Sequence, residues 1–153
     1  MSYAHVAHDC VIGKNVRQVS YTGLAGESVV DDWAIIGGAS VAHQFTKIGA
    51  HAMVQGGSKI GKDVPPYAMA GREPLSFCGI NIVGLRRRGF TLEQIDRIRE
   101  IYKVIYNSGL NRSDACNVLE NEFPASEEKD TILNFIRNSK RGIIKFTDLS
   151  IDE

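Results

Sequence analysis

A histidine followed directly by a carboxylate, at His8 and Asp9, is the pair of residues in this chain best suited to moving a proton. The unperturbed pKa of imidazole is about 6.5, so His8 can take a proton from a hydroxyl and return it at neutral pH. Asp9 can orient the ring or stabilise the imidazolium. The pair therefore predicts a general base. A histidine that only bonds to backbone at a chain corner is the alternative, and we expect that role for His51.

A second candidate site lies in a run of three arginines, Arg86, Arg87 and Arg88, shortly after Asn81. Arginine pairs bidentately with phosphate, and the amide of Asn offers both a donor and an acceptor to a base or a sugar. The segment therefore predicts a phosphate or nucleotide contact. A solvated charge run or a contact between subunits is the alternative interpretation.

The first 65 residues repeat with a period of six, and this repeat decides the fold that must position these side chains. An α-helix repeats every 3.6 residues or so and a half-buried strand about every 2, so a sustained period of six fits neither element alone. It fits a solenoid of short strands and tight corners, in which branched residues point inward and small residues let the backbone turn. A glycine-rich β-sandwich is the alternative. The inward positions are Val6, Ile12, Gln18, Leu24, Val30, Ile36, Ala42, Ile48, Val54 and Ile60.

The rest of the chain has a different character. The first 65 residues hold 5 basic and 5 acidic residues, and the remainder holds 13 of each. Thr91 and Gln94 form the pattern of a capping box, and an apolar stripe with helical spacing follows. Further helices are expected after Asn111 and after Ser126. The sequence therefore predicts a charge-rich helical part that follows a charge-poor solenoid.

Composition and charge exclude several classes of function. With 153 residues, 18 Lys and Arg, and 18 Asp and Glu, the formal net charge is zero. A general binder of nucleic acid or anionic membranes depends on a long-range field that this chain lacks. Three cysteines without a C-x-x-C pattern predict reduced thiols. No apolar run approaches the roughly 20 residues of a membrane span, and the first residues do not resemble a signal peptide, so we expect a soluble cytoplasmic protein.

Several segments together resemble the UDP-N-acetylglucosamine O-acyltransferases, the enzymes that begin lipid A synthesis. The most specific is Asn-Ile-Val-Gly-Leu-Arg-Arg-Arg-Gly-Phe at 81–90, and the others are 4–10, 30–38, 43–45 and 63–67. The resemblance implies a left-handed parallel β-helix with three hexads in each coil, followed by a C-terminal α-helical subdomain. It also implies transfer of an (R)-3-hydroxyacyl chain from acyl carrier protein to the 3-hydroxyl of UDP-N-acetylglucosamine, by a homotrimer without metal or a further cofactor.

On this basis the chain divides into a β-helix over 1–72, a connecting and nucleotide-binding segment over 73–90, a helical subdomain over 91–144 and a frayed tail over 145–153. Ten hexads make about three and a third coils, fewer than the family has, so we expect N-terminal coils to be missing. A non-catalytic trimeric scaffold left by truncation is therefore an alternative to the enzyme. A related sugar N-acyltransferase or acetyltransferase is another.

With three hexads in each coil, residues 18 apart lie above one another, about 4.8 Å apart as in parallel strands. His8 and Gly26 then share a column, so the Gly26 N–H can stabilise an oxyanion while His8 takes the hydroxyl proton. The resemblance implies these same two roles. It further implies a set of substrate-binding residues: His43, Gln44, Asn81, Arg87 and Arg88. His5 lies close enough to His8 to help shape the substrate site, and a corner residue bonded to backbone, as for His51, is the alternative. The resemblance also implies docking of acyl carrier protein on the helical subdomain, which presents Arg137, Lys140 and Arg141.

Gly56 matches the family position that closes the acyl groove, where glycine admits a longer chain. We therefore expect a long 3-hydroxyacyl donor, of about 14 carbons or more. A glycine needed only for a turn is the alternative. Two departures from the family are Glu27, where better-known members have histidine, and Val83, where they have glutamate. His5 and His8 are also spaced as in zinc enzymes of the β-helix class, but no third histidine lies at a matching height, so no metal site is expected.

Overall fold

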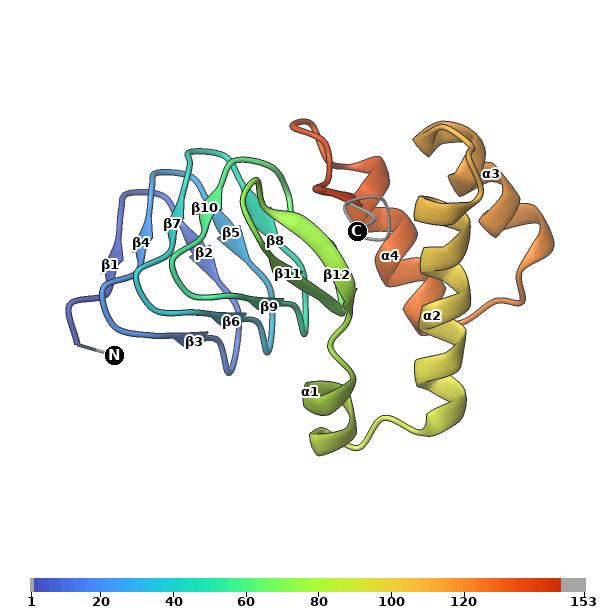
Figure 1. Ribbon diagram of the computed structural model, residues 1–153, viewed down its shortest axis with the longest axis horizontal. Coiled ribbons are helices and arrows are strands. Elements are labelled where there is room, and N and C mark those ends of the chain that lie inside the picture. Colours follow the sequence, from blue (N-terminus) through green and yellow to red (C-terminus); the bar gives the residue numbers. More distant parts are fainter. Residues whose placement is uncertain (1, 147–153) are drawn as a thin grey trace, which may run out of the picture.

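The computed structural model describes residues 2–146 and begins with a solenoid of short parallel strands (Figure 1). Each hexad contributes one two-residue strand, and strands of successive coils pair in register, with His5 opposite Gly23 and Val6 opposite Leu24. Three faces result, in the orders β1-β4-β7-β10, β2-β5-β8 and β3-β6-β9. The strands are β1 (His5–Val6), β2 (Val11–Ile12), β3 (Arg17–Gln18), β4 (Gly23–Leu24), β5 (Val29–Val30), β6 (Ile35–Ile36), β7 (Val41–Ala42), β8 (Lys47–Ile48), β9 (Met53–Val54) and β10 (Lys59–Ile60).

The inward positions of the hexad form the core of the solenoid, as predicted. From the second coil onward they are almost completely buried, and Leu24, Ile36 and Ile48 are each about 1% exposed. In the first coil Val6 and Ile12 remain 45% and 41% exposed, because no described coil lies beneath them. Serine and threonine hydroxyls close the corners by donating to the carbonyl three residues earlier, as Ser28 Oγ does to the Ala25 oxygen at 2.7 Å.

The corners turn at positions that the sequence did not indicate. In every hexad up to residue 57, the third residue after the inward one has a positive φ, and most of these residues are not glycine, for example Trp33 at 66° and His51 at 59°. A non-glycine residue in this region is strained by about 1 to 2 kcal/mol. The expectation that small residues make the turn was wrong. Gly37 is small for another reason, since a Cβ there would lie 2.3 Å from the Gly56 nitrogen of the next coil.

A hairpin and a short C-terminal strand extend the third face. Strand β11 (Ala68–Gly71) pairs with β9 and, antiparallel, with β12 (Ser76–Ile80). Strand β13 (Lys145–Phe146) then pairs in parallel with β12. The expected frayed tail is therefore wrong for its first two residues, because their backbone completes a sheet edge. The other residues of that tail, 147–153, lie outside the described residues.

Four helices follow the hairpin: α1 (Ile82–Arg87), α2 (Leu92–Asn107), α3 (Arg112–Glu122) and α4 (Glu127–Arg137). The last three begin at the predicted N-caps, Thr91, Asn111 and Ser126, each of which accepts a backbone N–H in the first turn. The capping box of Thr91 and Gln94 is complete. The prediction of a parallel β-helix followed by a helical subdomain is thus confirmed.

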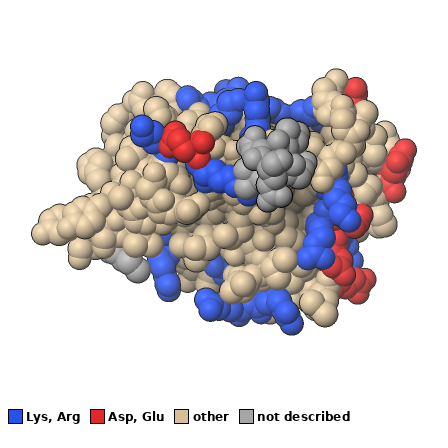
Figure 2. All heavy atoms as spheres, viewed as in Figure 1, with Lys and Arg blue, Asp and Glu red and all other residues tan. Residues whose placement is uncertain are grey.

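The helices are attached to the solenoid by buried polar contacts as well as by packing. The Tyr102 hydroxyl of α2 donates to the Pro66 carbonyl. Asp63, almost fully buried, accepts from the Lys47 N–H at 2.8 Å and from the Ser139 hydroxyl at 2.5 Å. In the view of Figure 2, the Asp and Glu side chains lie mainly over the helical part of the molecule. Within residues 2–146, no helix is long and apolar enough to cross a membrane.

Candidate functional site

His8 lies at the corner between β1 and β2, and its ring lies against Gly26 of the next coil. A Cβ atom on Gly26 would be 2.6 Å from His8 Cε1 and 2.7 Å from Nε2, so the ring occupies the space that a side chain at position 26 would need. The Glu27 N–H donates to the His8 carbonyl oxygen at 3.0 Å and holds the two coils in register. We call His8, Asp9 and Gly26 the His8 corner.

The contact between His8 and Asp9 orients the imidazole. Asp9 Oδ2 lies 3.2 Å from His8 Nδ1. Because an ionised carboxylate only accepts, this contact favours a proton on Nδ1 and leaves the lone pair of Nε2 free to take another. The two side chains are 68% and 76% exposed, so their ion pair contributes little to stability. The His8 corner thus holds an accessible base.

The backbone of Gly26 supplies a hydrogen-bond donor beside this base. The N–H groups of Ala25 and Glu27 bond to neighbouring coils, whereas the Gly26 N–H donates to no residue within 2–146. An unused backbone N–H at a buried position is suited to stabilising negative charge that develops on a substrate oxygen. The His8 ring and the Gly26 backbone therefore lie side by side, as their shared column predicts.

The other predicted residues of this column lie nearby on the same edge of the solenoid. His43 and Gln44 are exposed on the coil above Gly26, and the Phe45 N–H donates to the Gly26 carbonyl at 3.2 Å. Arg141, which is expected on a docking surface, is exposed and donates from Nη1 to the Gln44 carbonyl at 3.2 Å, so it ties the C-terminal segment to this edge. His5 is exposed on β1, and among the described hydrogen bonds none joins its ring to His8.

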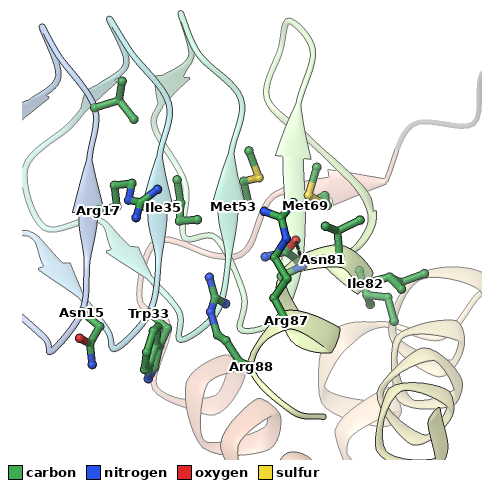
Figure 3. A pocket seen from close by; sticks show the side chains of 14 residues that line it. Asn15, Arg17, Trp33, Ile35, Met53, Met69, Asn81, Ile82, Arg87 and Arg88 are labelled. Atoms are coloured by element: carbon green, nitrogen blue, oxygen red, sulfur yellow. Dashed lines mark hydrogen bonds between the residues drawn. The ribbon is translucent and has the colours of Figure 1, made fainter. Parts of the chain in front are cut away.

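A groove of about 830 Å³ lies on the third face, where the solenoid meets α1 (Figure 3). Its floor is apolar and is formed by strand residues, among them Ile35, Met53 and Met69. Its rim is cationic, with Arg17 on β3 and with Arg87 and Arg88 at the end of α1. An apolar floor beneath three guanidinium groups suits an amphiphilic or nucleotide ligand with phosphates at the rim.

Val83 and Asn81, two residues of the 81–90 segment singled out in the sequence, also line this groove. Val83, a departure from the glutamate of better-known family members, is 63% exposed and presents an apolar side chain to the groove. Asn81 is only 4% exposed and its amide is engaged internally: Nδ2 donates to the His51 carbonyl at 3.0 Å, and Oδ1 accepts from the Gly84 N–H at 3.2 Å. Asn81 therefore caps α1, and a direct contact with nucleotide stays a prediction.

Arg88 is held by an aromatic stack that the sequence did not indicate. Trp33, His51 and Tyr67 occupy one corner of successive coils, with ring centroids 6.3 Å and 5.8 Å apart and nearly parallel planes. We call these three residues the His51 ladder. Arg88 lies 5.3 Å above the Trp33 ring, and its Nη1 lies 3.1 Å from His51 Nδ1.

Burial, and the positive charge of Arg88, lower the pKa of His51 to about 4. Burial and the nearby charge of Arg17 lower the pKa of Arg88 itself. His51 is therefore neutral at pH 7, and its Nδ1 accepts from Arg88, because a guanidinium can only donate. The His51 ladder is thus uncharged at pH 7 and holds the cationic side chain of Arg88.

The sequence-predicted residues fall on three different corners of one chain. His8 and Gly26 lie at the corner between the first and second faces, and Arg88 lies beside the ladder between the second and third faces. Gly56 lies at the remaining corner, where a Cβ would be 3.1 Å from the Gly38 oxygen, and it does not line the groove. The base and the arginines are therefore not brought together within one chain.

Sequence reasoning missed Arg17 and Trp33, which line the groove, and His51, which contacts the groove residues Trp33 and Arg88. Arg17 stands 18 residues before the groove residue Ile35, and Trp33 stands 18 residues before His51, so the coil period could have placed them. Within residues 2–146, no group of three or more His, Cys, Asp or Glu side chains could hold a metal ion.

These features define a class of protein: a parallel β-helix that carries a histidine corner on one edge, a cationic groove on another and a helical C-terminal subdomain. The family profile described as Udp N-acetylglucosamine O-acyltransferase, Domain 2, matches residues 63–144. The chain belongs to this family.

Relatives and solved structures agree with this assignment. An acyl-[acyl-carrier-protein]–UDP-N-acetylglucosamine O-acyltransferase from Thiobacillus denitrificans is 40% identical over 145 residues, which are 95% of this chain and 56% of that protein. The structure of a UDP-N-acetylglucosamine acyltransferase from Francisella novicida superposes with a TM-score of 0.92 at 38% identity and covers 98% of this chain and 55% of that one. One from Bacteroides fragilis is 49% identical with a TM-score of 0.79, over 93% and 53%. The chain thus spans about half the length of the relatives it matches.

Proposed function

We propose that this chain takes part in transferring a long (R)-3-hydroxyacyl group from acyl carrier protein to the 3-hydroxyl of UDP-N-acetylglucosamine, the first step of lipid A synthesis. The observation that carries the proposal is the His8 corner, where the ring of a potential base lies directly against a glycine with an unused N–H. Family membership supports the same reaction.

The chemistry needs one base and one oxyanion donor. His8 Nε2 takes the proton of the sugar hydroxyl as its oxygen attacks the thioester carbon. The Gly26 N–H donates to the oxyanion of the tetrahedral intermediate. When the intermediate collapses, the carbon–sulfur bond breaks, and His8 returns the proton to the leaving thiolate of the carrier's phosphopantetheine. Asp9 holds the ring in the tautomer that makes Nε2 the acceptor.

The cationic groove is the proposed site of the nucleotide. Arg87 and Arg88 provide bidentate donors for phosphate oxygens at its rim. In our proposal Asn81 orders the start of α1 and so helps to place these arginines. His5, His43 and Gln44 contact the sugar or the acyl donor at the edge that carries His8.

A homotrimer reconciles this reaction with the separation of the two sites. The His8 corner is exposed and lies on a different edge from Arg88, so one chain alone neither excludes water nor joins base to nucleotide. If subunits pack around a threefold axis, the His8 corner of one subunit can face the groove of the next. Gly56, at the third corner, then sets the length of the acyl chain, and acyl carrier protein docks on the helical subdomain.

The experiment is an assay of UDP-N-acetylglucosamine acylation by this chain with 3-hydroxyacyl carrier protein of varied chain length, and with acetyl-CoA as the competing donor. We expect acylation by the long carrier-protein donors, with Arg87→Ala raising the KM for the nucleotide sugar. Use of acetyl-CoA alone would indicate a sugar acetyltransferase. A trimer that transfers no acyl group would contradict the proposal and favour a scaffold.

A further inference from the structure

We propose that His51 is the positioning residue of the groove: its ring accepts a hydrogen bond from Arg88, and its backbone carbonyl holds Asn81. The inference rests on the proposed function for the identity of the ligand that Arg88 meets. It extends that function to a residue at a corner of the solenoid, where the sequence indicated only a turn.

The His51 ring is fixed on several sides. It lies between Trp33 and Tyr67, with interplanar angles of 7° and 16°, and Phe90 packs against it in a T-shaped arrangement, at a centroid distance of 5.0 Å and an interplanar angle of 74°. Stacked and edge-to-face pairs of this kind restrain a ring without hydrogen bonds. Its Nδ1 is therefore a fixed acceptor rather than one that rotates in solvent.

Polar contacts join His51 to both ends of α1, one through its ring and one through its backbone carbonyl. The 3.1 Å contact from Arg88 Nη1 to His51 Nδ1 spans 37 residues of sequence. The 3.0 Å bond from Asn81 Nδ2 to the His51 carbonyl spans 30. Since Asn81 also caps α1, one solenoid residue sets the position of the helix and of the arginine that follows it.

The charges around His51 keep its ring an acceptor. Arg88 faces it from the end of α1, Asp32 from the same corner, and Tyr67 from the next coil. The positive charge of Arg88 disfavours a second cation beside it, and Asp32 opposes this effect more weakly than burial and Arg88 produce it. Protonation of His51 would remove the lone pair that Arg88 uses.

Arg88 keeps its charge available for a ligand. Of the ion pairs within residues 2–146, none includes Arg88. Its side chain rests on the Trp33 face and on His51, both of which are uncharged. A guanidinium oriented by neutral partners retains donors for an anion, whereas one paired with a carboxylate would be neutralised.

Two substitutions separate the roles of the ring. His51→Phe keeps the stack and removes the acceptor, and a phenyl ring is compatible with the positive φ of 59°, since Phe45 adopts 64° at an equivalent corner position. His51→Asn removes the stack and keeps an acceptor at the place of Nδ1, and asparagine tolerates positive φ well. The backbone carbonyl that holds Asn81 is unchanged in both.

The test is UDP binding by calorimetry, with thermal unfolding of each variant as the control. We expect His51→Phe to weaken UDP binding about tenfold, as for loss of a bond to a charged group, and His51→Asn to stay within about threefold of the wild type. In an Arg88→Ala background, His51→Phe should have no further effect. Unchanged binding by His51→Phe would overturn the proposal, and weakening by His51→Asn alone would then show that only the packing of the ring matters. Equal weakening by both substitutions would show that an acceptor at this position does not suffice to place Arg88, which would also overturn the proposal.

A second measurement does not depend on UDP or on folding of the His51 variants. The ring nitrogen resonances of ¹⁵N-labelled wild type should show an unprotonated Nδ1 at pH 7, and Arg88→Ala should shift that resonance. An unshifted Nδ1 would overturn the positioning role. If the wild type bound no UDP while Nδ1 shifted as expected, the proposed nucleotide site would fail and the coupling of His51 to Arg88 would stand.

Discussion

The His8 corner and the His51 ladder are built from the same six-residue turn, yet they hold their histidines in opposite ways. The His8 side chain is 68% exposed, and the polar contact to its ring comes from the adjacent Asp9. His51 is half-buried between two aromatic rings and binds the guanidinium of a residue from another element. The same repeat thus carries one exposed histidine and one half-buried histidine that stays neutral at pH 7.

The difference follows from what is packed against each corner. The hairpin, α1 and Phe90 cover the ladder, whereas the His8 edge receives mainly the Arg141 side chain along its upper coils. Solvent exposure suits a group that must gain and lose a proton, and burial suits one that must keep a fixed state. The exposed His8 corner therefore suits proton transfer, and the covered His51 ladder suits the positioning of Arg88.

Among changes to the residues packed around the two histidines, the largest expected effect comes from Gly26→Ala. The added Cβ would lie 2.6 Å from His8 Cε1, and because that ring is exposed it can swing aside at little cost in stability. We expect acyl transfer to fall about 100-fold through displacement of the base, with the midpoint of thermal unfolding nearly unchanged. Kinetics and unfolding on the same preparation test this, and full activity would separate Gly26 from the reaction.

Gly49→Ala is the corresponding change at the corner that carries the His51 ladder. Its Cβ would lie 2.5 Å from the Pro66 nitrogen, and backbone cannot swing aside as a side chain does. We expect a loss of about 2 kcal/mol in the free energy of unfolding, measured by urea titration. Equal stability of the Gly26 and Gly49 variants would contradict the view that one corner is open and the other is packed.

Phe90→Ala tests the cover of the ladder, with Phe45→Ala as its control. Phe90 contacts the rings of His51 and Tyr67, and its loss should reduce stability by about 1 kcal/mol and weaken UDP binding. Phe45 is an exposed aromatic residue on the His8 edge, so its removal should change stability by less than about 0.5 kcal/mol. Reversal of this order would contradict the comparison.

A further expected effect is a pH dependence of stability. Burial and Arg88 lower the pKa of His51 from 6.5 to about 4, so the unfolded chain binds more protons than the folded one between these values. Stability contributed by neutral His51 is present above pH 6.5 and is lost as the pH falls toward 4. Urea titrations across this window should show a shallower decline for His51→Asn, and parallel curves would argue against a neutral, buried His51.

The repeat made the solenoid predictable because each hexad is a local unit. The inward positions, the 18-residue register and the three N-caps depend on residues close in sequence or on one period, and the structure has them where they were predicted. The pairing of His8 with Gly26 followed from the same register. The positive φ at Trp33 and His51 was missed because no glycine marks these corners.

Contacts between elements far apart in sequence could not be predicted in this way. His51 meets Arg88 across 37 residues, and no pattern within either segment signals the other. Lys145 and Phe146 pair with β12, which a local view of the tail could not show. Asn81 was expected to face nucleotide, but the cap of α1 and the His51 carbonyl use both ends of its amide.

The central claim, that His8 is the base of the transfer, is tested most directly by chemical rescue. His8→Ala should reduce acylation of UDP-N-acetylglucosamine by about 100-fold to 10,000-fold, the range typical for loss of a general base. We expect added imidazole to occupy the vacated space and to restore activity in proportion to its concentration of free base. Acylation that is unaffected by His8→Ala, or a loss that imidazole does not relieve at any pH, would contradict the account.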